Sequence, residues 1–236
     1  MGRGFVVLGW LVVASLAAAH AAMTTDEAAG LGVVSGSLKG KAAIVTGARN
    51  NIGRAFAQVL AAQGADVLVH YHRPATKDQA EETARLVREA GGRAELFVGD
   101  LGDPANVRGM FDACETAFGG GDLVCINAGK IIKVPMAQMT DEQLAEQVNI
   151  NTNGTFYCAR EAARRTRDGG RIIFTGTSLL AGGAPGYASY AGTKAAMEEL
   201  TRCLPRELAD RRITVNTIAP GPIDTPFFWS QENEAS

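Results

Sequence analysis

The sequence predicts an α/β fold, a doubly wound parallel sheet with helices on both of its faces. From residue 38 onward, short apolar segments alternate with longer amphipathic ones, which is typical of parallel strands joined by crossover helices. A turn containing glycine follows the first apolar segment, and hydrophobic residues make up 46% of the chain, enough for one continuous core. No internal repeat or linker divides residues 38–236, so we expect one domain there.

Six apolar segments are expected to be the strands, because each is short and is bounded by turn or helix signals. They are residues 42–45, 66–71, 94–98, 123–126, 171–175 and 213–218.

The first helices are placed by local signals at their ends. One begins near Ile52, after the glycine-containing turn. Residues 77–90 form a second helix, which carries apolar residues on one face and stops at two glycines. Asp103, followed by a proline, is the N-cap of a third.

Two longer helices follow. Thr140 and Gln143 fit a capping box that opens a helix running toward residue 163. Residues 187–208 form the last long helix, and Pro205 is expected to kink or end it because proline lacks a backbone donor.

Charge and cysteine content exclude several classes of protein. The formal net charge is −2, so no basic surplus is available to neutralise the phosphates of a nucleic acid. The four cysteines form no CxxC pair and no cluster with histidine, so we expect neither a metal site nor a disulfide framework.

Residues 1–22 form a segment of a different kind. A short positive start precedes an apolar run over residues 5–19, and small residues at 19–21 fit a cleavage site, which is typical of a secretory signal peptide. The run is somewhat short for a membrane-spanning helix. Two other interpretations stay open, namely that the segment is a membrane anchor and that translation starts at Met23.

The turn after the first strand is a candidate phosphate-binding site. Its glycines, Gly47 and Gly53, let the backbone turn sharply and approach a pyrophosphate, whose charge the following helix N-terminus then meets. An ordinary strand-to-helix turn is the alternative. The position of this turn directly after the first strand favours a dinucleotide site.

Tyr190 and Lys194 are the candidate acid–base pair. They are four residues apart and so lie on one face of a helix. A phenol has a pKa near 10 and is a poor acid–base group at neutral pH, and a neighbouring cation can lower that pKa. A surface pair on a helix is the alternative interpretation.

These motifs resemble those of the short-chain dehydrogenase/reductase family, which has a Rossmann-like NAD(P)-binding fold. Thr46, Gly47 and Gly53 match its T-G-x-x-x-G-x-G turn, with Asn51 where the middle glycine is expected. Asparagine tolerates a positive φ better than most residues, so the turn can survive this change. Tyr190 and Lys194 match the family's Y-x-x-x-K pair.

The resemblance implies further residues of the catalytic set. Asn151 matches the family's helix asparagine, which supports a proton-relay water beside the lysine. A hydroxyl residue about a dozen positions before the tyrosine holds the substrate oxygen. We prefer Ser178 for this role, although Thr177 fits the spacing equally well.

The resemblance also implies cofactor contacts spread along the chain. They are Gly47, Arg49, Asn51, Ile52, Gly53, Tyr71, His72, Arg73, Asp100, Leu101, Asn127, Ala128, Gly129, Tyr190, Lys194, Pro220, Gly221, Ile223 and Thr225.

Basic residues favour NADP(H) over NAD(H), although NAD(H) stays possible. The second strand ends without the carboxylate that usually binds the ribose 2′-hydroxyl of NAD. Instead, His72 and Arg73 follow it, and Arg49 in the turn could point to the same place. Together they would complement a 2′-phosphate, whereas a solvated basic loop is the alternative.

We therefore expect an NADP(H)-dependent oxidoreductase that transfers hydride between the nicotinamide and a small-molecule carbonyl or alcohol, such as a ketone or a 3-oxoacyl group. The resemblance implies a homo-oligomer. The competing expectation is an inactive nucleotide-binding sensor or scaffold. Because reduced cofactor is supplied chiefly inside cells, we expect an intracellular catalytic domain, with membrane contact only through residues 1–22.

The resemblance further implies a helical segment that covers the substrate and a seventh strand, both after Thr225. The chain ends at Ser236, so we expect a C-terminally short domain without this lid. The sixth strand would then lie at an uncovered sheet edge.

Overall fold

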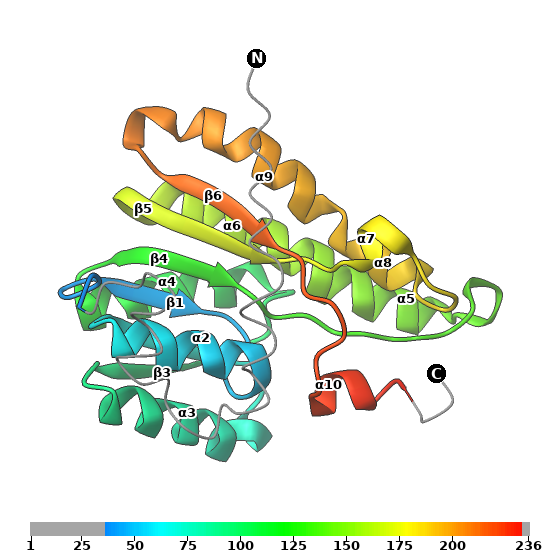
Figure 1. The fold of residues 1–236 in the computed structure, drawn as a ribbon, viewed down its shortest axis with the longest axis horizontal. Coiled ribbons are helices and arrows are strands. Elements are labelled where there is room, and N and C mark those ends of the chain that lie inside the picture. Colours follow the sequence, from blue (N-terminus) through cyan, green and yellow to red (C-terminus); the bar gives the residue numbers. More distant parts are fainter. Residues whose placement is uncertain (1–35, 233–236) are drawn as a thin grey trace.

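The computed structural model describes residues 36–232 and contains a six-stranded sheet in the order β3-β2-β1-β4-β5-β6 (Figure 1). All neighbouring strands are parallel, which confirms the predicted fold class. The strands are β1 (Ala42–Val45), β2 (Asp66–Tyr71), β3 (Ala94–Val98), β4 (Gly121–Ile126), β5 (Thr166–Thr175) and β6 (Thr214–Ile218).

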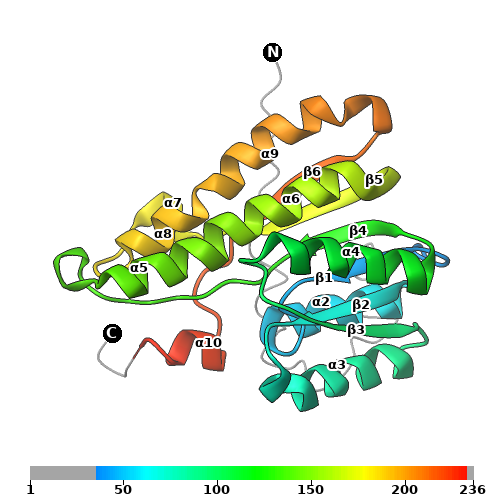
Figure 2. The same ribbon diagram turned by 180° about the vertical axis from the view of Figure 1, so that it is seen from behind.

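Helices cover both faces of this sheet. On one face lie α2 (Asn51–Ala62) and α3 (Lys77–Glu89), and on the other lie α4 (Pro104–Phe118), α6 (Gly154–Arg165) and α9 (Ala196–Glu207) (Figures 1 and 2). Four shorter helices are α5 (Asp141–Val148), α7 (Leu179–Gly182), α8 (Ala188–Lys194) and α10 (Pro226–Trp229).

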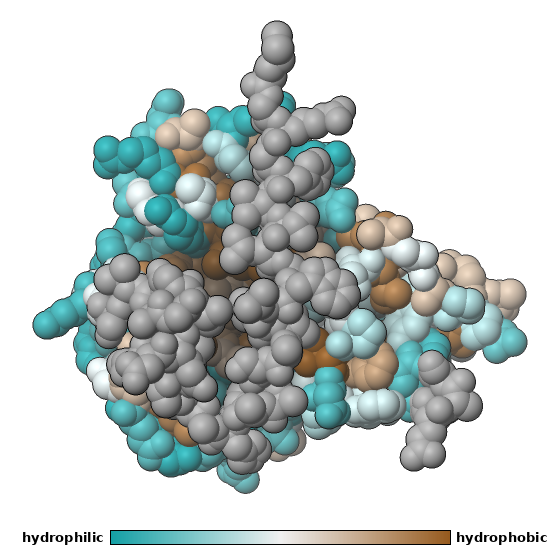
Figure 3. Space-filling view, viewed as in Figure 1, coloured by the Kyte–Doolittle hydropathy of each residue, from teal (hydrophilic) through white to brown (hydrophobic). Residues whose placement is uncertain are grey.

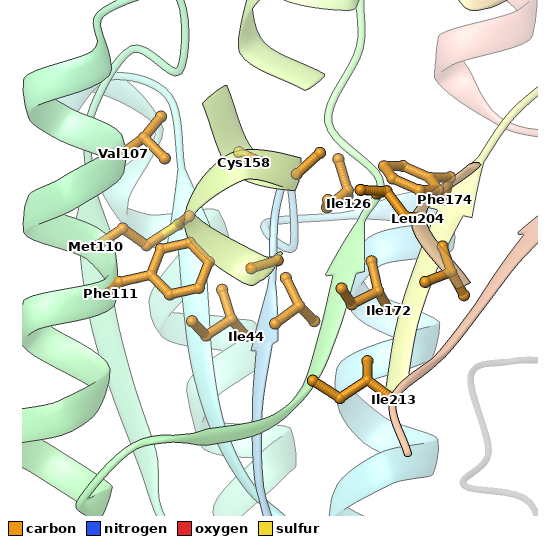
Figure 4. Packing of buried hydrophobic residues seen from close by; sticks show 14 of the residues in the cluster. Ile44, Val107, Met110, Phe111, Ile126, Cys158, Ile172, Phe174, Leu204 and Ile213 are labelled. Atoms are coloured by element: carbon orange, nitrogen blue, oxygen red, sulfur yellow. The ribbon is translucent and has the colours of Figure 1, made fainter. Parts of the chain in front are cut away.

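Two hydrophobic cores hold the helices to the sheet. Figure 4 shows the larger one, in which Ile44 and Phe174 from the strands pack with Met110 of α4 and Leu204 of α9. The smaller core joins the other side of the strands to α2 and α3. Since β1 and β4 are neighbours and their crossovers run to opposite faces, a crevice forms at their carboxyl ends, where such sheets bind ligands.

The expected helix at 140–163 is interrupted at its centre. The capping box at Thr140 is present, but Asn149–Asn153 form a π-helical turn between α5 and α6. Such turns are rare and often occur at functional sites.

Other boundaries differ from the sequence prediction as well. The helix expected at 187–208 divides into α8 and α9 at Ala195, while Pro205 lies inside α9, which continues to Glu207. The fifth strand begins at Thr166 rather than at residue 171, because Thr166 pairs with Gly121 across a register shift. In the described chain β6 does lie at a sheet edge, as expected.

The segment expected to be a signal peptide or anchor, residues 1–22, lies outside the described residues. Within residues 36–232, no helix is long and apolar enough to cross a membrane. Figure 3 shows a mainly hydrophilic rim around α2 and α3, whereas hydrophobic residues reach the surface on the side of α7, α8 and α10.

Candidate active site

A cavity of about 1210 Å³ opens at the carboxyl ends of the strands. One end, the turn end, is formed by the glycine-containing turn and the end of β2, and the other, the α10 end, by α10 and the loop after β4. The predicted site residues in its lining are Gly47, Arg49, Asn51, Ile52, Gly53, Tyr71, His72, Arg73, Asp100, Leu101, Asn127, Ala128, Gly129, Ser178, Tyr190, Lys194, Pro220, Gly221, Ile223 and Thr225.

The turn end has the tight backbone that its sequence predicts. Gly47 and Asn51 both adopt positive φ angles, 64° and 49°, so asparagine does substitute for the glycine expected there. A Cβ atom on Gly53 would lie 2.3 Å from the Gly47 carbonyl oxygen. Only glycine lets helix α2 start this close to the turn.

Thr46 and Asn127 tie this turn to β4. The Thr46 hydroxyl accepts the amides of Asn127 and Ala128 at 2.8 and 3.0 Å, and the Asn127 side chain donates to the Thr46 carbonyl at 3.1 Å. The two strand ends on either side of the crevice are therefore held at a fixed spacing.

His70 ties the same turn to β3, a role that sequence reasoning missed. Its Nδ1 accepts the Gly47 amide at 3.0 Å, and its Nε2 lies 2.9 Å from the Gly99 carbonyl. The side chain is buried, and burial lowers its pKa to about 4. The available signal was a polar residue in an otherwise apolar strand.

Basic side chains collect where the second strand ends. Burial, and then the charge of Arg73, lowers the pKa of Arg49, so the two guanidinium groups repel each other. Asp100 also lies here, with its Oδ1 3.9 Å from His72 Nδ1. The excess of positive charge suits an anion at this point.

Tyr190 and Lys194 are both buried in α8. Lys194 Nζ donates to the Thr175 carbonyl at 2.9 Å, and burial lowers its pKa to about 8. Burial raises the pKa of Tyr190 to about 12. Burial is the cause of this rise, and the role of Lys194 in lowering the tyrosine pKa stays a prediction.

Asn151 does not line the cavity and lies behind it, in the π-helical turn. Its side chain accepts the Lys130 amide at 2.8 Å and donates to the Lys130 carbonyl at 2.8 Å and to the Thr193 hydroxyl at 3.0 Å. Its amide thus fixes the loop after β4 beside Gly129. A Cβ on Gly129 would lie 3.0 Å from Lys194 Nζ.

The two candidate hydroxyls differ in their surroundings. Thr177 is buried, and its hydroxyl accepts the Leu179 amide at 3.3 Å. Ser178 is exposed, and its backbone amide donates to the Pro220 carbonyl at 3.0 Å. Both residues line the cavity.

The loop after β6 continues into α10. Thr225 is the N-cap of α10, and its hydroxyl accepts the Phe228 amide at 3.4 Å and donates to the Ile223 carbonyl at 3.2 Å. This hydroxyl is thus already engaged within its own loop.

Residues on both sides of Trp229 line the α10 end of the cavity, namely Pro226, Phe227, Phe228, Ser230, Gln231 and Glu232. They are fastened by a group we call the Glu232 cluster (Lys133, Tyr187, Gln231 and Glu232). Glu232 accepts from the Tyr187 hydroxyl and pairs with Lys133 Nζ at 2.5 Å, while the Lys133 amide donates to Gln231 at 2.9 Å. Burial, and then the Glu232 carboxylate, raises the pKa of Tyr187 above its usual range.

Comparison with known proteins agrees with this geometry. The profile of a family described as enoyl-(acyl carrier protein) reductase matches residues 47–235. A short-chain type dehydrogenase/reductase of Picea abies is 40% identical over 209 residues, covering 84% of this chain and 76% of its own. The tetrahydroxynaphthalene reductase of Pyricularia oryzae is 37% identical over 199 residues, covering 84% and 70%.

Solved structures are similar as well. A dehydrogenase of Burkholderia cenocepacia with bound NADP superposes with a TM-score of 0.82 at 36% identity, covering 88% of this chain and 78% of its own.

The chain belongs to the short-chain dehydrogenase/reductase family, with its Rossmann-like fold. It is an oxidoreductase that uses a nicotinamide cofactor and acts on a small molecule. This corrects the competing expectation of an inactive sensor or scaffold.

Proposed function

We propose that this protein is an NADPH-dependent reductase of ketones carried by aromatic or polycyclic molecules. The observation that carries the proposal is that one cavity joins the basic turn end, Tyr190 and Lys194, and an α10 end lined by aromatic side chains. Tyr187, Phe227 and Phe228 there offer ring faces and edges to a flat substrate. Relatives named versicolorin reductase and tetrahydroxynaphthalene reductase support this substrate class.

The residues of the turn end fit a dinucleotide phosphate. Gly47 leaves room for a close backbone approach, since a Cβ there would lie 3.0 Å from Ala128 Cα. Arg49 and Arg73 repel each other, and a 2′-phosphate between them would relieve that repulsion. We assign Arg49, His72 and Arg73 to this phosphate, Asp100 and Leu101 to the adenine, and Pro220 to Thr225 to the nicotinamide.

When bound, the cofactor supplies the hydride. The Tyr190 hydroxyl donates the proton to the substrate oxygen, and its pKa of about 12 keeps it protonated at neutral pH, as a proton donor in reduction must be. Lys194, held by the Thr175 carbonyl, is mainly protonated at neutral pH with its pKa of about 8. Its charge stabilises the phenolate left on Tyr190 after the transfer.

A hydroxyl group completes the site by donating to the substrate oxygen. The sequence favours Ser178, whereas the buried hydroxyl supports Thr177. The Leu179 amide occupies an acceptor position of Thr177 Oγ1, which leaves its proton to be donated into the cavity. A fixed donor stabilises developing negative charge better than a mobile one. We therefore assign the role to Thr177.

The test is NADPH oxidation with a panel of aromatic and aliphatic ketones. Tyr190→Phe is expected to lower kcat by about 10²–10⁴-fold, the usual contribution of a proton donor. Tyr157→Phe is the matched control, because Tyr157 packs on the core and does not line the cavity. Thr177→Val is expected to lose far more activity than Ser178→Ala. Turnover that is unchanged in Tyr190→Phe would refute the mechanism.

A further inference from the structure

His70 takes no part in the mechanism above, yet it is the buried titratable group in contact with the phosphate-binding turn. Three successive amides of that turn donate hydrogen bonds to the protein. Those of Thr46 and Ala48 go to the backbone carbonyls of Cys125 and His70, at 3.0 and 2.8 Å. The Gly47 amide has a side chain as its acceptor, His70 Nδ1 at 3.0 Å.

The partners of the imidazole determine its tautomer. A backbone amide can only donate, so Nδ1 facing Gly47 carries a lone pair. A carbonyl oxygen can only accept, so Nε2 facing Gly99 carries the proton. His70 is therefore neutral with its proton on Nε2, since a proton on Nδ1 would oppose the Gly47 amide.

The two partners belong to opposite parts of the nucleotide site. Gly47 is the first glycine of the turn, and Gly99 precedes Asp100, which we assign to the adenine. The ring also stacks on Phe97 of β3 at a centroid distance of 6.5 Å. Its position is thus fixed by two hydrogen bonds and a packed neighbour.

We propose that His70 is a positioning residue for the cofactor, which sets the distance between the phosphate-binding turn and the adenine-binding end of β3. This role rests on the proposed function. The imidazole suits it because its two nitrogens lie on opposite sides of a rigid ring and can carry one acceptor and one donor. A side chain of similar shape without nitrogens would leave the Gly47 amide unpaired and the spacing free to change.

The first test uses variants and measures cofactor binding apart from turnover. His70→Phe keeps the ring and removes both hydrogen bonds, and we expect the NADPH Kd from fluorescence titration to rise about tenfold or more. His70→Asn restores an acceptor and a donor and should recover part of that loss. At saturating NADPH, kcat should stay within about twofold of the unmodified protein in both variants, because His70 does not touch the substrate.

Gln147→Leu is the matched control for a general loss of packing. Gln147 is equally buried and also bridges two elements, accepting from Ile132 and donating to Ser189, away from the turn. Its NADPH Kd should not change. If His70→Phe folds and binds NADPH as tightly as the unmodified, active protein, then the positioning role of His70 is overturned and the proposed function is not. Failure of the unmodified protein to bind NADP(H) would overturn the proposed function and this role together.

The second test needs no variant and holds even if His70→Phe does not fold. Two-dimensional ¹H–¹⁵N spectra of the histidine side chains distinguish the two neutral tautomers from imidazolium. At neutral pH His70 should show the Nε2–H tautomer, both free and with NADPH bound. An Nδ1–H tautomer or an imidazolium signal would contradict the proposal.

Discussion

At its turn end, the cavity is held by hydrogen bonds between strand ends, whereas its α10 end is held by side chains from separate loops. Thr46, His70 and Asn127 fasten the turn to the ends of β3 and β4, and each lies in a strand or directly after one. Lys133, Tyr187 and Glu232 come from three segments outside the strands. The turn end, where we place the cofactor, therefore depends on the same strands that form the sheet. The α10 end, where we place the substrate, can change in sequence without altering the sheet.

The largest expected effect tests the rigidity of the turn end. Gly53→Ala places a Cβ 2.3 Å from the Gly47 oxygen and 2.8 Å from Asn127 Nδ2, and backbone must move to relieve it. We expect a loss of about 1–3 kcal/mol in stability, typical of overpacking, and NADPH binding too weak to titrate. Thermal unfolding and fluorescence titration measure the two effects.

Gly192→Ala is the control for this change. Gly192 lies in α8 with nothing within 4 Å of its Cβ position, so alanine should be neutral or stabilise the helix by up to about 1 kcal/mol. Normal NADPH affinity in Gly53→Ala would show that the turn can adapt. The turn end would then not be the more rigid end of the cavity.

The next effect separates cofactor choice from cofactor binding. Arg73→Ala removes one of the two guanidinium groups assigned to the 2′-phosphate, so the preference for NADPH over NADH should narrow by about 1–3 kcal/mol, the scale of a charged hydrogen bond. The Kd values of both cofactors measure it. Arg88→Ala, on the exposed end of α3, should leave the preference unchanged. Equal Kd values for NADPH and NADH in the unmodified protein would contradict this assignment.

Much of the turn end was predictable from sequence because local rules govern it. A strand, a glycine-containing turn and a helix are contiguous in the chain, and positive φ at Asn51 follows from residue type. The spacing of Tyr190 and Lys194 likewise needs only one helix. The break at Asn149–Asn153 was not predictable, because Asn151 reaches a loop far away in sequence.

The Glu232 cluster escaped prediction for the same physical reason. Its members carry no periodic pattern, and their contacts span up to 99 positions of the chain. The burial that raises the pKa of Tyr190 was also not visible, because a sequence shows a neighbouring charge but not how deeply the phenol is buried. His70 was missed because a strand residue gives no sign of which end of a neighbouring strand its ring will meet.

The smallest expected effect concerns the α10 end. Glu232→Gln keeps the size of the side chain but removes the charge that pairs with Lys133. Glutamine can still accept the Tyr187 hydroxyl, so we expect a loss of about 1 kcal/mol, the scale of one hydrogen bond, and a rise of roughly fivefold in the KM for a good ketone substrate. Because the cluster does not touch the turn, the Kd for NADPH should be unchanged. Glu115→Gln is the control for the loss of one negative charge, because Glu115 lies on α4 and pairs with Arg165 at the surface. If Glu232→Gln instead weakens NADPH binding and leaves KM as it was, then the two ends of the cavity are coupled, and the substrate end is not the independent part that its loop contacts indicate.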